Sequence, residues 1–174
     1  MTGTSDRGFT LIELLIVVAI ISIIAAIAVP GLLRARMTGN ETSAIASLKV
    51  TTSSQVAFSS SCGNGGYATD YVVLGTPVVA GSEPFISADL GLSVAPQKSG
   101  YNFTLGAGTA APGPNDCLGR PTNSGYYGTA IPQTFGSTGT RSFAVDTGNT
   151  IWQSTTPTAP AQPFTSSATD APIQ

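Results

Sequence analysis

An uncharged apolar segment at residues 14–33 constrains this 174-residue chain more than any other feature of its sequence. Leu, Ile, Val and Ala dominate it, and about 20 such residues at 1.5 Å each span the hydrocarbon core of a bilayer. Arg34, Ala35 and Arg36 follow at once, without the small-residue cleavage site that ends a secretory signal. The segment is therefore predicted to remain in the chain as a membrane-spanning helix.

The composition of the whole chain narrows the function classes. Only 9% of the residues are charged and the net charge is −2, so no basic surface is available to attract nucleic acid. Histidine is absent, which removes the commonest general base and metal ligand. No glycine-rich phosphate-binding motif is present, and the scattered acidic residues lack calcium-binding spacing. We therefore predict a protein that is not an enzyme and needs no cofactor, metal or nucleotide.

The residues that open the apolar segment form a specific pattern. A short polar leader ends in Gly8, Phe9 follows, and Glu13 is the one charged residue in the stretch GFTLIELLIVVAIISIIAAIAVPG. This pattern resembles the N-terminus of type IV prepilins and their pseudopilin relatives, closely as far as Pro30 and loosely as far as Ser60. The resemblance implies cleavage by a prepilin peptidase between Gly8 and Phe9, N-methylation of the new Phe9 amine, and assembly through the N-terminal helix.

The lone carboxylate of Glu13 has two interpretations. A carboxylate inside a bilayer is costly, and the charged amine of a neighbouring subunit would offset a comparable amount, which favours assembly in one axial register. The resemblance implies this pairing. Alternatively, Glu13 interacts with the N-terminal dipole of its own helix or reaches to the membrane interface. We predict the assembly role, so that Glu13→Ala leaves membrane insertion intact and blocks filament formation.

Pro30 and Gly31 interrupt the helical pattern, and Gly39 is a second weak point. We predict a helix break at these positions. The resemblance suggests that residues 30–39 lose helicity in a filament, and an ordinary kink with continuous helix on both sides is the alternative. Helical spacing then returns, so the helix is predicted to run from Phe9 to about Ser60, with an amphipathic second half whose apolar positions are Ile45, Leu48, Thr52 and Val56.

Beyond Ser61 the sequence changes to short strands and turns. Aromatic and β-branched residues gather in runs, and turn residues at 146–149 predict a hairpin over residues 141–153. The chain is therefore predicted to have an α+β fold, in which a long N-terminal helix packs against a small antiparallel sheet of three or four strands, as in pilin heads. The predicted strand runs are residues 101–105, 125–130, 141–145 and 150–153.

Two cysteines and the C-terminal tail complete the prediction. In the cytosol Cys62 and Cys117 would be two separate thiols, whereas in an exported head an even number favours a disulfide. Such a bridge would tie a loop rich in Gly and Pro to the end of the helix. From Thr155 onward the chain is rich in Pro, Ala, Thr and Ser, and is predicted to be extended or disordered.

These observations predict a subunit of a type IV pilus that serves adhesion, twitching motility or DNA uptake. It would be held in a bacterial inner membrane with its head in the periplasm, and then polymerise with copies of itself into an extracellular filament. Membrane lipid, prepilin peptidase and the assembly machinery are its predicted partners. The alternatives are a pseudopilin of a type II secretion system and a signal-anchored envelope binding protein. The predicted division is leader 1–8, transmembrane assembly helix 9–33, amphipathic helix 34–60, sheet head 61–154 and tail 155–174.

Overall fold

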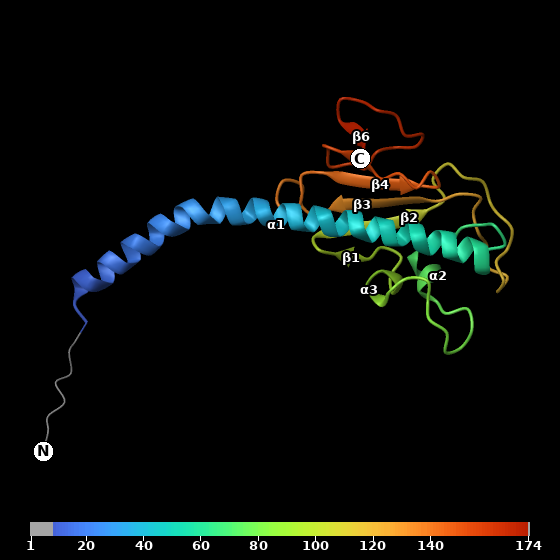
Figure 1. The fold of residues 1–174 in the computed structure, drawn as a ribbon, viewed down its shortest axis with the longest axis horizontal. Helices are drawn as coiled ribbons and strands as arrows, with labels where there is room; N and C mark the ends of the chain where they lie inside the picture. The colour runs from blue at the N-terminus through green and yellow to red at the C-terminus, as the bar shows by residue number, and fades with distance from the viewer. Residues whose placement is uncertain (1–8, 174) are drawn as a thin grey trace, which may run out of the picture. The chain divides into compact units, whose positions relative to one another are not determined.

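The computed structural model describes residues 9–173 (Figure 1). The chain divides after Arg36 into two compact units, and each is described by itself. The first contains the N-terminal part of helix α1 (Leu11–Ser61). The second contains the rest of α1 together with two short helices and one β-sheet. The fold class is therefore α+β, as the sequence predicts.

Helix α1 continues through the positions where a break was predicted. Pro30, Gly31 and Gly39 all lie inside it, so the prediction of a break is wrong for the single chain. Proline withdraws one backbone hydrogen bond, but helix propagation is cooperative, and the flanking turns of Ala, Ile, Val, Leu and Met keep the helix intact. Loss of helicity on assembly is a separate prediction, which a single chain does not test.

Gly39 occupies a position that does not require glycine. A Cβ atom added there would meet nothing within 4 Å, and its φ is not positive. We expect Gly39→Ala to raise the free energy of unfolding by about 0.5–1 kcal/mol, because glycine is that much poorer than alanine inside a helix. Urea unfolding of the full-length protein in detergent, followed by the fluorescence of its single tryptophan, measures this change. Unchanged or lower stability would contradict it.

Within residues 9–173, six antiparallel strands form one sheet, in the order in which they follow along the chain. The predicted number of three or four is too low, because the two outer strands are only two and three residues long and such short runs show no readable alternation. The four predicted strands are all present. In chain order the strands are β1 (Gln97–Lys98), β2 (Tyr101–Gly106), β3 (Tyr127–Pro132), β4 (Ser142–Asp146), β5 (Trp152–Ser154) and β6 (Asp170–Pro172).

The second part of α1 lies along this sheet and shares its core (Figure 1). The predicted apolar face of the helix is displaced by one residue from the observed one: Leu48 is buried as expected, but Ile45 and Thr52 are half-buried and Val56 is 48% exposed. The fully buried positions of this part of the helix, all with no exposed surface, are instead Ala44, Leu48, Thr51, Gln55 and Phe58.

Two polar side chains on the buried face of α1, Thr51 and Gln55, find hydrogen-bond partners there. The Thr51 hydroxyl donates to the Ser47 carbonyl oxygen at 2.9 Å and lies 3.2 Å from the Tyr71 hydroxyl. The Gln55 amide exchanges two hydrogen bonds with the backbone of Ala68, at 3.0 and 2.9 Å. Hydrogen bonding makes such burial tolerable, and a search for apolar spacing overlooks it.

The predicted hairpin is confirmed in β4 and β5, which pair antiparallel. Its turn is held by Asp146, whose backbone carbonyl accepts from the Asn149 amide at 2.9 Å and whose side chain accepts from the Gly148 amide at 2.8 Å. Asn149 has a φ of 59°, a left-handed conformation that asparagine tolerates better than most residues. The turn chemistry visible in the sequence therefore determines the loop.

The C-terminal tail packs on the head, so of the two predicted alternatives the disordered one is wrong and the extended one is seen in β6. Strand β6 pairs with β5 at the edge of the sheet, and an edge strand tolerates proline. Phe164 stacks on Trp152 with ring centroids 5.4 Å apart. The Tyr127 hydroxyl donates to the Pro160 carbonyl oxygen at 2.6 Å. A composition poor in apolar residues predicts disorder, but a few well-placed ring contacts and backbone hydrogen bonds suffice to dock this tail.

Two short helices, α2 (Tyr71–Gly75) and α3 (Ala88–Gly91), pack against each other beside α1. They meet at Gly75 and Gly91, where a Cβ atom on Gly75 would lie 2.2 Å from the Gly91 carbonyl oxygen. Any larger residue would push the two helices apart. This close contact fixes both ends of the loop of residues 76–87 between them.

Cys62 and Cys117 form the predicted disulfide, with their Cα atoms 4.8 Å apart. The Cys117 backbone amide also donates to the Cys62 carbonyl oxygen at 2.7 Å. The bridge thus joins the loop around Cys117 to the residue that follows the C-terminal end of α1. Because an exported protein meets an oxidising compartment, the disulfide agrees with the predicted export.

Removing the bridge is expected to lower the stability of the head. For a Cys62→Ser/Cys117→Ser double variant we expect a loss of about 2–4 kcal/mol in the free energy of unfolding, since the unfolded chain regains the freedom of the closed loop. Urea unfolding of the oxidised wild type and the double variant gives the difference. Reduced wild type serves as the control and should match the variant. Equal stability of all three would contradict the prediction.

Candidate functional site

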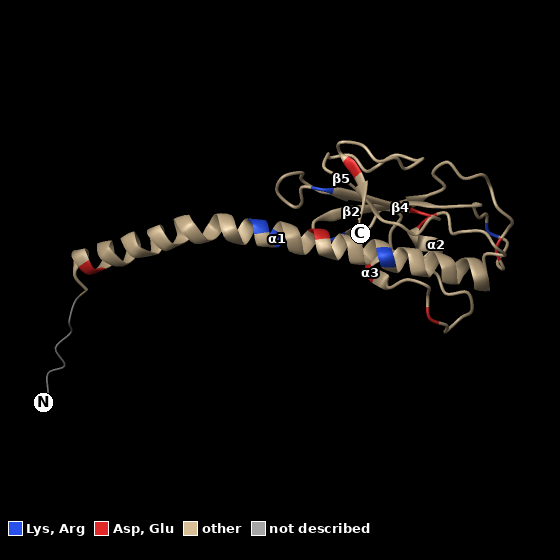
Figure 2. Cartoon of the chain, turned by 45° about the horizontal axis from the view of Figure 1, so that its top comes forward, with Lys and Arg blue, Asp and Glu red and all other residues tan. Residues whose placement is uncertain are grey.

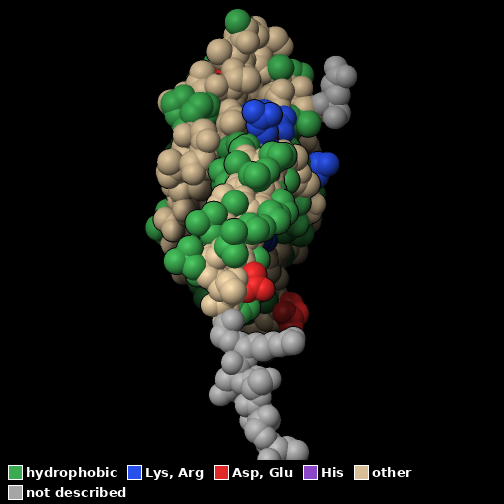
Figure 3. All heavy atoms as spheres, turned by 90° about the vertical axis from the view of Figure 1, so that its left-hand side faces the viewer, with side chains coloured by type: hydrophobic (Ala, Val, Ile, Leu, Met, Phe, Trp, Pro, Cys, Tyr) green, Lys and Arg blue, Asp and Glu red, His purple; other side chains and the backbone are tan. Residues whose placement is uncertain are grey.

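The apolar half of α1 presents its side chains outward. Between Leu11 and Leu33 the large hydrophobic residues are 47–79% exposed, and hydrophobic side chains cover this stretch of the surface in Figure 3. No charged residue lies between Glu13 and Arg34 (Figure 2). Among residues 9–173, α1 is the one helix long and apolar enough to cross a membrane. An element of this kind needs lipid or other apolar helices around it.

The start of α1 is closed by a capping box. The Thr10 backbone amide and hydroxyl donate to Glu13 Oε2 at 3.0 and 2.6 Å, and the Glu13 amide donates back to the Thr10 hydroxyl at 3.3 Å. The sequence Thr-Leu-Ile-Glu has the residue types and spacing of this motif. In the single chain, therefore, Glu13 interacts with its own helix terminus, which is the alternative interpretation of its carboxylate.

The capping box uses only part of the Glu13 carboxylate. Both hydrogen bonds from Thr10 go to Oε2, and Oε1 accepts none within residues 9–173. A carboxylate oxygen can accept two hydrogen bonds. Glu13 can consequently accept from a further cation without releasing Thr10, so the two interpretations are compatible.

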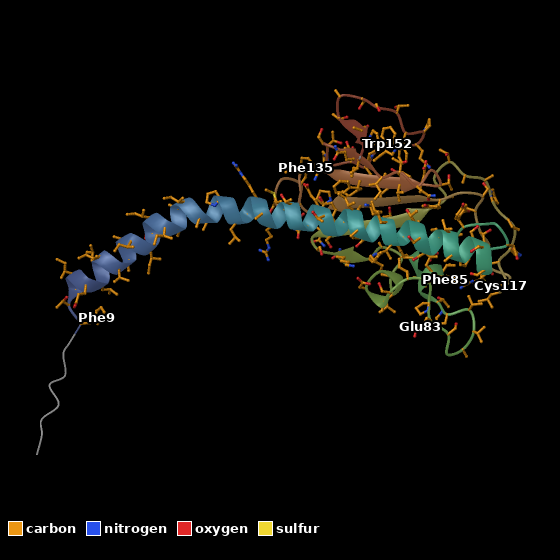
Figure 4. The ribbon with its side chains drawn as sticks, in the orientation of Figure 1. Phe9, Glu83, Phe85, Cys117, Phe135 and Trp152 are labelled. Carbon is orange, nitrogen blue, oxygen red and sulfur yellow. A yellow bond between two sulfur atoms is a disulfide. The ribbon has the colours of Figure 1, made fainter. Side chains whose placement is uncertain are left out.

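The predicted processing site lies just ahead of this cap. Gly8 is outside the described residues, and Phe9 precedes the first turn of α1 and is 80% exposed. Figure 4 shows Phe9 at the start of the described chain. Phe9 therefore lies outside the helix and open to solvent.

A second charged site, which sequence reasoning missed, joins α1 to the head. Glu41 is 4% exposed. Its Oε2 accepts from Arg141 Nε at 2.8 Å and Nη2 at 2.6 Å, and its Oε1 accepts from the Thr140 amide at 2.8 Å and the Thr140 hydroxyl at 2.9 Å. Both oxygens are thus fully used. The bidentate geometry makes this a strong ion pair.

Arg141 is held on its other side as well. Its Nη1 donates to Gln153 Oε1 at 2.7 Å, and its guanidinium lies 5.5 Å from the centre of the Phe143 ring. Burial alone would raise the pKa of the Glu41 carboxyl, but the hydrogen bonds from Thr140 and Arg141 outweigh burial and hold that pKa below its ordinary value of 4.5. Glu41 is therefore charged and structural.

The sequence contained evidence that Glu41 is buried and paired. Glu41 and Lys49 are the only charged residues from position 40 to the end of α1. Glu41 also lies three and seven residues before Ala44 and Leu48, which places it on the same helix face as the core. A lone acid on the core-facing side of a helix indicates a buried partner.

No three His, Cys, Asp or Glu side chains gather as metal ligands would among residues 9–173. The charged groups that do meet form pairs: Glu41 with Arg141, Asp89 with Lys98, and Asp116 with Arg120. Neighbouring hydrogen bonds support the acids of all three pairs, whereas Arg120 Nη2 is buried without a hydrogen-bond partner among the described residues. These pairs serve packing, whereas the exposed apolar helix has no apolar surface of residues 9–173 against it.

Comparisons with known proteins agree with this emphasis on the N-terminus. Residues 4–29 match the family described as prokaryotic N-terminal methylation motif. A type IV wide pilus major component, PilA4 of Thermus thermophilus, is 64% identical over 36 residues, which are 21% of this chain and 28% of that protein. The type IV major pilin protein PilA of Myxococcus xanthus is 47% identical over 53 residues, 30% of this chain and 24% of its own length.

The likeness covers a small part of each protein. The matched region spans about a quarter of the length of either relative, and no solved structure shows a significant match to the chain. By its methylation motif and its relatives, the N-terminal region of the chain is similar to that of type IV pilins.

Proposed function

We propose that this chain is a structural subunit of a type IV pilus filament. The observation that carries the proposal is the outward-facing apolar half of α1, which begins directly at the methylation motif. Lipid covers such a surface in a membrane, and equivalent helices of other copies cover it in a filament. The two relatives support the same assignment, since both are pilus components by name and neither name describes an enzyme.

Under this proposal the chain is processed before it assembles. Prepilin peptidase removes residues 1–8 by cutting between Gly8 and Phe9, and the Phe9 amine is then methylated. Residues 9–33 hold the subunit in the inner membrane, with the head on the periplasmic side. The exposure of Phe9 ahead of the helix supports access by both enzymes.

Assembly then joins the charged Phe9 amine of one subunit to Glu13 of another. The free Oε1 of Glu13 supports this step, because it accepts the ammonium while Oε2 keeps its hydrogen bonds from Thr10. Opposite charges attract strongly in apolar surroundings. The pair therefore favours the one axial position in which amine and carboxylate meet.

The mass of the N-terminal peptide, measured on protein sheared from the cell surface, tests the proposal. A peptide that begins with methylated Phe9, recovered from sheared fibres, is the expected result. Processed protein that stays in the cell envelope would replace the proposal with a pseudopilin. An intact Met1 would leave only a signal-anchored protein, and the role of Glu13 would fail with it.

A further inference from the structure

The charged side chains without partners are segregated by sign. Within residues 9–173, the side chains of Arg36 and Lys49 form no ion pair or hydrogen bond. Both cations belong to α1. The corresponding acids, Glu83 and Asp170, both belong to the head, one in the loop of residues 76–87 and the other in β6. The chain thus carries complementary charges that it does not pair within itself.

Lys49 borders a groove on the outward face of α1. The groove has a volume of about 400 Å³, and Val50, Ser53, Ser54, Ala57 and Phe85 complete its lining. Val50 is 47% exposed, and most of the other lining side chains are small. An exposed lysine has little cost in a free subunit. Once a partner covers the groove, however, the ammonium needs a counter-charge.

The loop of residues 76–87 presents an acid on a preformed turn. The Ser82 backbone amide and hydroxyl both donate to the Val79 carbonyl oxygen, at 3.0 and 2.9 Å, and Gly81 has a φ of 86°. Val79 is 65% exposed, and Glu83 follows the turn directly. The tip therefore offers an apolar side chain and a carboxylate in a fixed arrangement.

The base of the same loop is anchored to α1. The Ser54 hydroxyl donates to the Phe85 carbonyl oxygen at 2.6 Å, and the Phe85 amide donates to the Leu74 carbonyl oxygen at 3.0 Å. Figure 4 shows Phe85 close to the helix and Glu83 farther out on the loop. The loop thus walls the groove of its own copy with Phe85 and directs Glu83 away from it.

We propose that the tip of this loop in one copy docks into the groove of a second copy, with Glu83 against Lys49 and Val79 against the apolar lining. The inference rests on the proposed filament function and names a contact between its heads. In a filament each copy gives its loop to one neighbour and receives the loop of another, so the contact is heterologous, and repeating it without closing a ring builds an open helical array. Charge complementarity identifies the second copy as the occupant.

Charge exchange tests this contact in cells that assemble the wild-type chain into sheared fibres. Lys49→Glu and Glu83→Lys should each lower fibre yield by about tenfold or more, because like charges then face each other. The double variant Lys49→Glu/Glu83→Lys should restore most of the yield. Asp170→Lys is the matched control: alone it should leave the yield unchanged, and it should not rescue Lys49→Glu. Rescue by Asp170→Lys, or wild-type yield from either single reversal, would overturn the inference.

Cysteine cross-linking decides between a contact across copies and one within a copy. Fibres of a Lys49→Cys/Glu83→Cys variant, oxidised mildly, should give a ladder of covalent oligomers on a denaturing, non-reducing gel, whereas a bridge within one chain would give monomers and overturn the inference. Failure of the wild type to form fibres would instead defeat the proposed function. Unfolding of the purified single variants in detergent should match wild type, which shows that lost fibres do not reflect lost folding.

Discussion

Replacing Glu41 with alanine is expected to lower the free energy of unfolding by about 2–3 kcal/mol, because it removes the charged hydrogen bonds of Glu41 and leaves the partly exposed Arg141 guanidinium without its counter-charge. The same change removes the acceptor of the Thr140 amide and hydroxyl. Urea unfolding of the full-length protein in detergent gives the difference. Trp152 is its natural reporter, since it is the single tryptophan and stacks on Phe164 within the head.

Two controls separate the buried pair from a general effect of charge. Glu83→Ala removes an exposed acid without an intramolecular partner and should change stability by less than about 0.5 kcal/mol. A Glu41→Met/Arg141→Met double variant should cost less than the sum of the two single variants, because the pair is lost together. A Glu41→Ala loss no larger than that of Glu83→Ala would show that the pair contributes nothing.

The same pair makes stability depend on acid. The folded protein holds the pKa of Glu41 below its unfolded value of 4.5, so the stabilisation is present above that value and is lost as the pH falls through the folded pKa. Hydrogen bonds lower the pKa values of Asp89 and Asp116 as well, so they contribute in the same range. Stability measured from pH 7 down to pH 2 should therefore decline less in Glu41→Gln than in wild type. Parallel curves would contradict this.

Removing the charge of Glu13 is expected to abolish fibres while sparing the helix cap. Glutamine serves as well as glutamate in a capping box, so Glu13→Gln keeps the hydrogen bonds with Thr10 and loses only the attraction for a neighbouring amine. Thr10→Ala does the reverse, because it removes the capping hydroxyl and keeps the carboxylate. We therefore expect fibre yield to fall to background in Glu13→Gln and to persist in Thr10→Ala.

Membrane level and N-terminal mass accompany this measurement, so that faults of insertion or processing are not mistaken for faults of assembly. Both variants should be inserted and cut before Phe9 like wild type. The opposite pattern, with fibres from Glu13→Gln and none from Thr10→Ala, would mean that Glu13 acts only as a cap.

The sequence predicted correctly those elements that depend on neighbouring residues or on the cellular compartment. The apolar run gave the long helix, turn residues at 146–149 gave the hairpin, and an even cysteine count in an exported chain gave the disulfide. Each depends on residues that are close in sequence or on the compartment. None requires knowledge of which surfaces meet in the folded chain.

The features that sequence reasoning missed depend on distant partners. Glu41 pairs with Arg141, which lies 100 residues later in the sequence. Gln55 can be buried because the Ala68 backbone forms two hydrogen bonds with its amide. The tail docks because Phe164 reaches Trp152. Composition alone made this segment resemble a linker. Tertiary contact thus overrode both the apolar spacing of the helix and the polarity of the tail.

Under the proposed filament function, the exposed half of α1 bears on how subunits leave a fibre as well as how they enter it. Lipid tails are about as apolar as the leucine and isoleucine side chains of a neighbouring helix, so moving this helix from membrane to fibre changes little hydrophobic free energy. What distinguishes the two surroundings is then a few polar contacts such as those of Glu13. We expect such an exchange to be readily reversed, which allows a dismantled fibre to return its subunits to the bilayer still folded and fit for reuse.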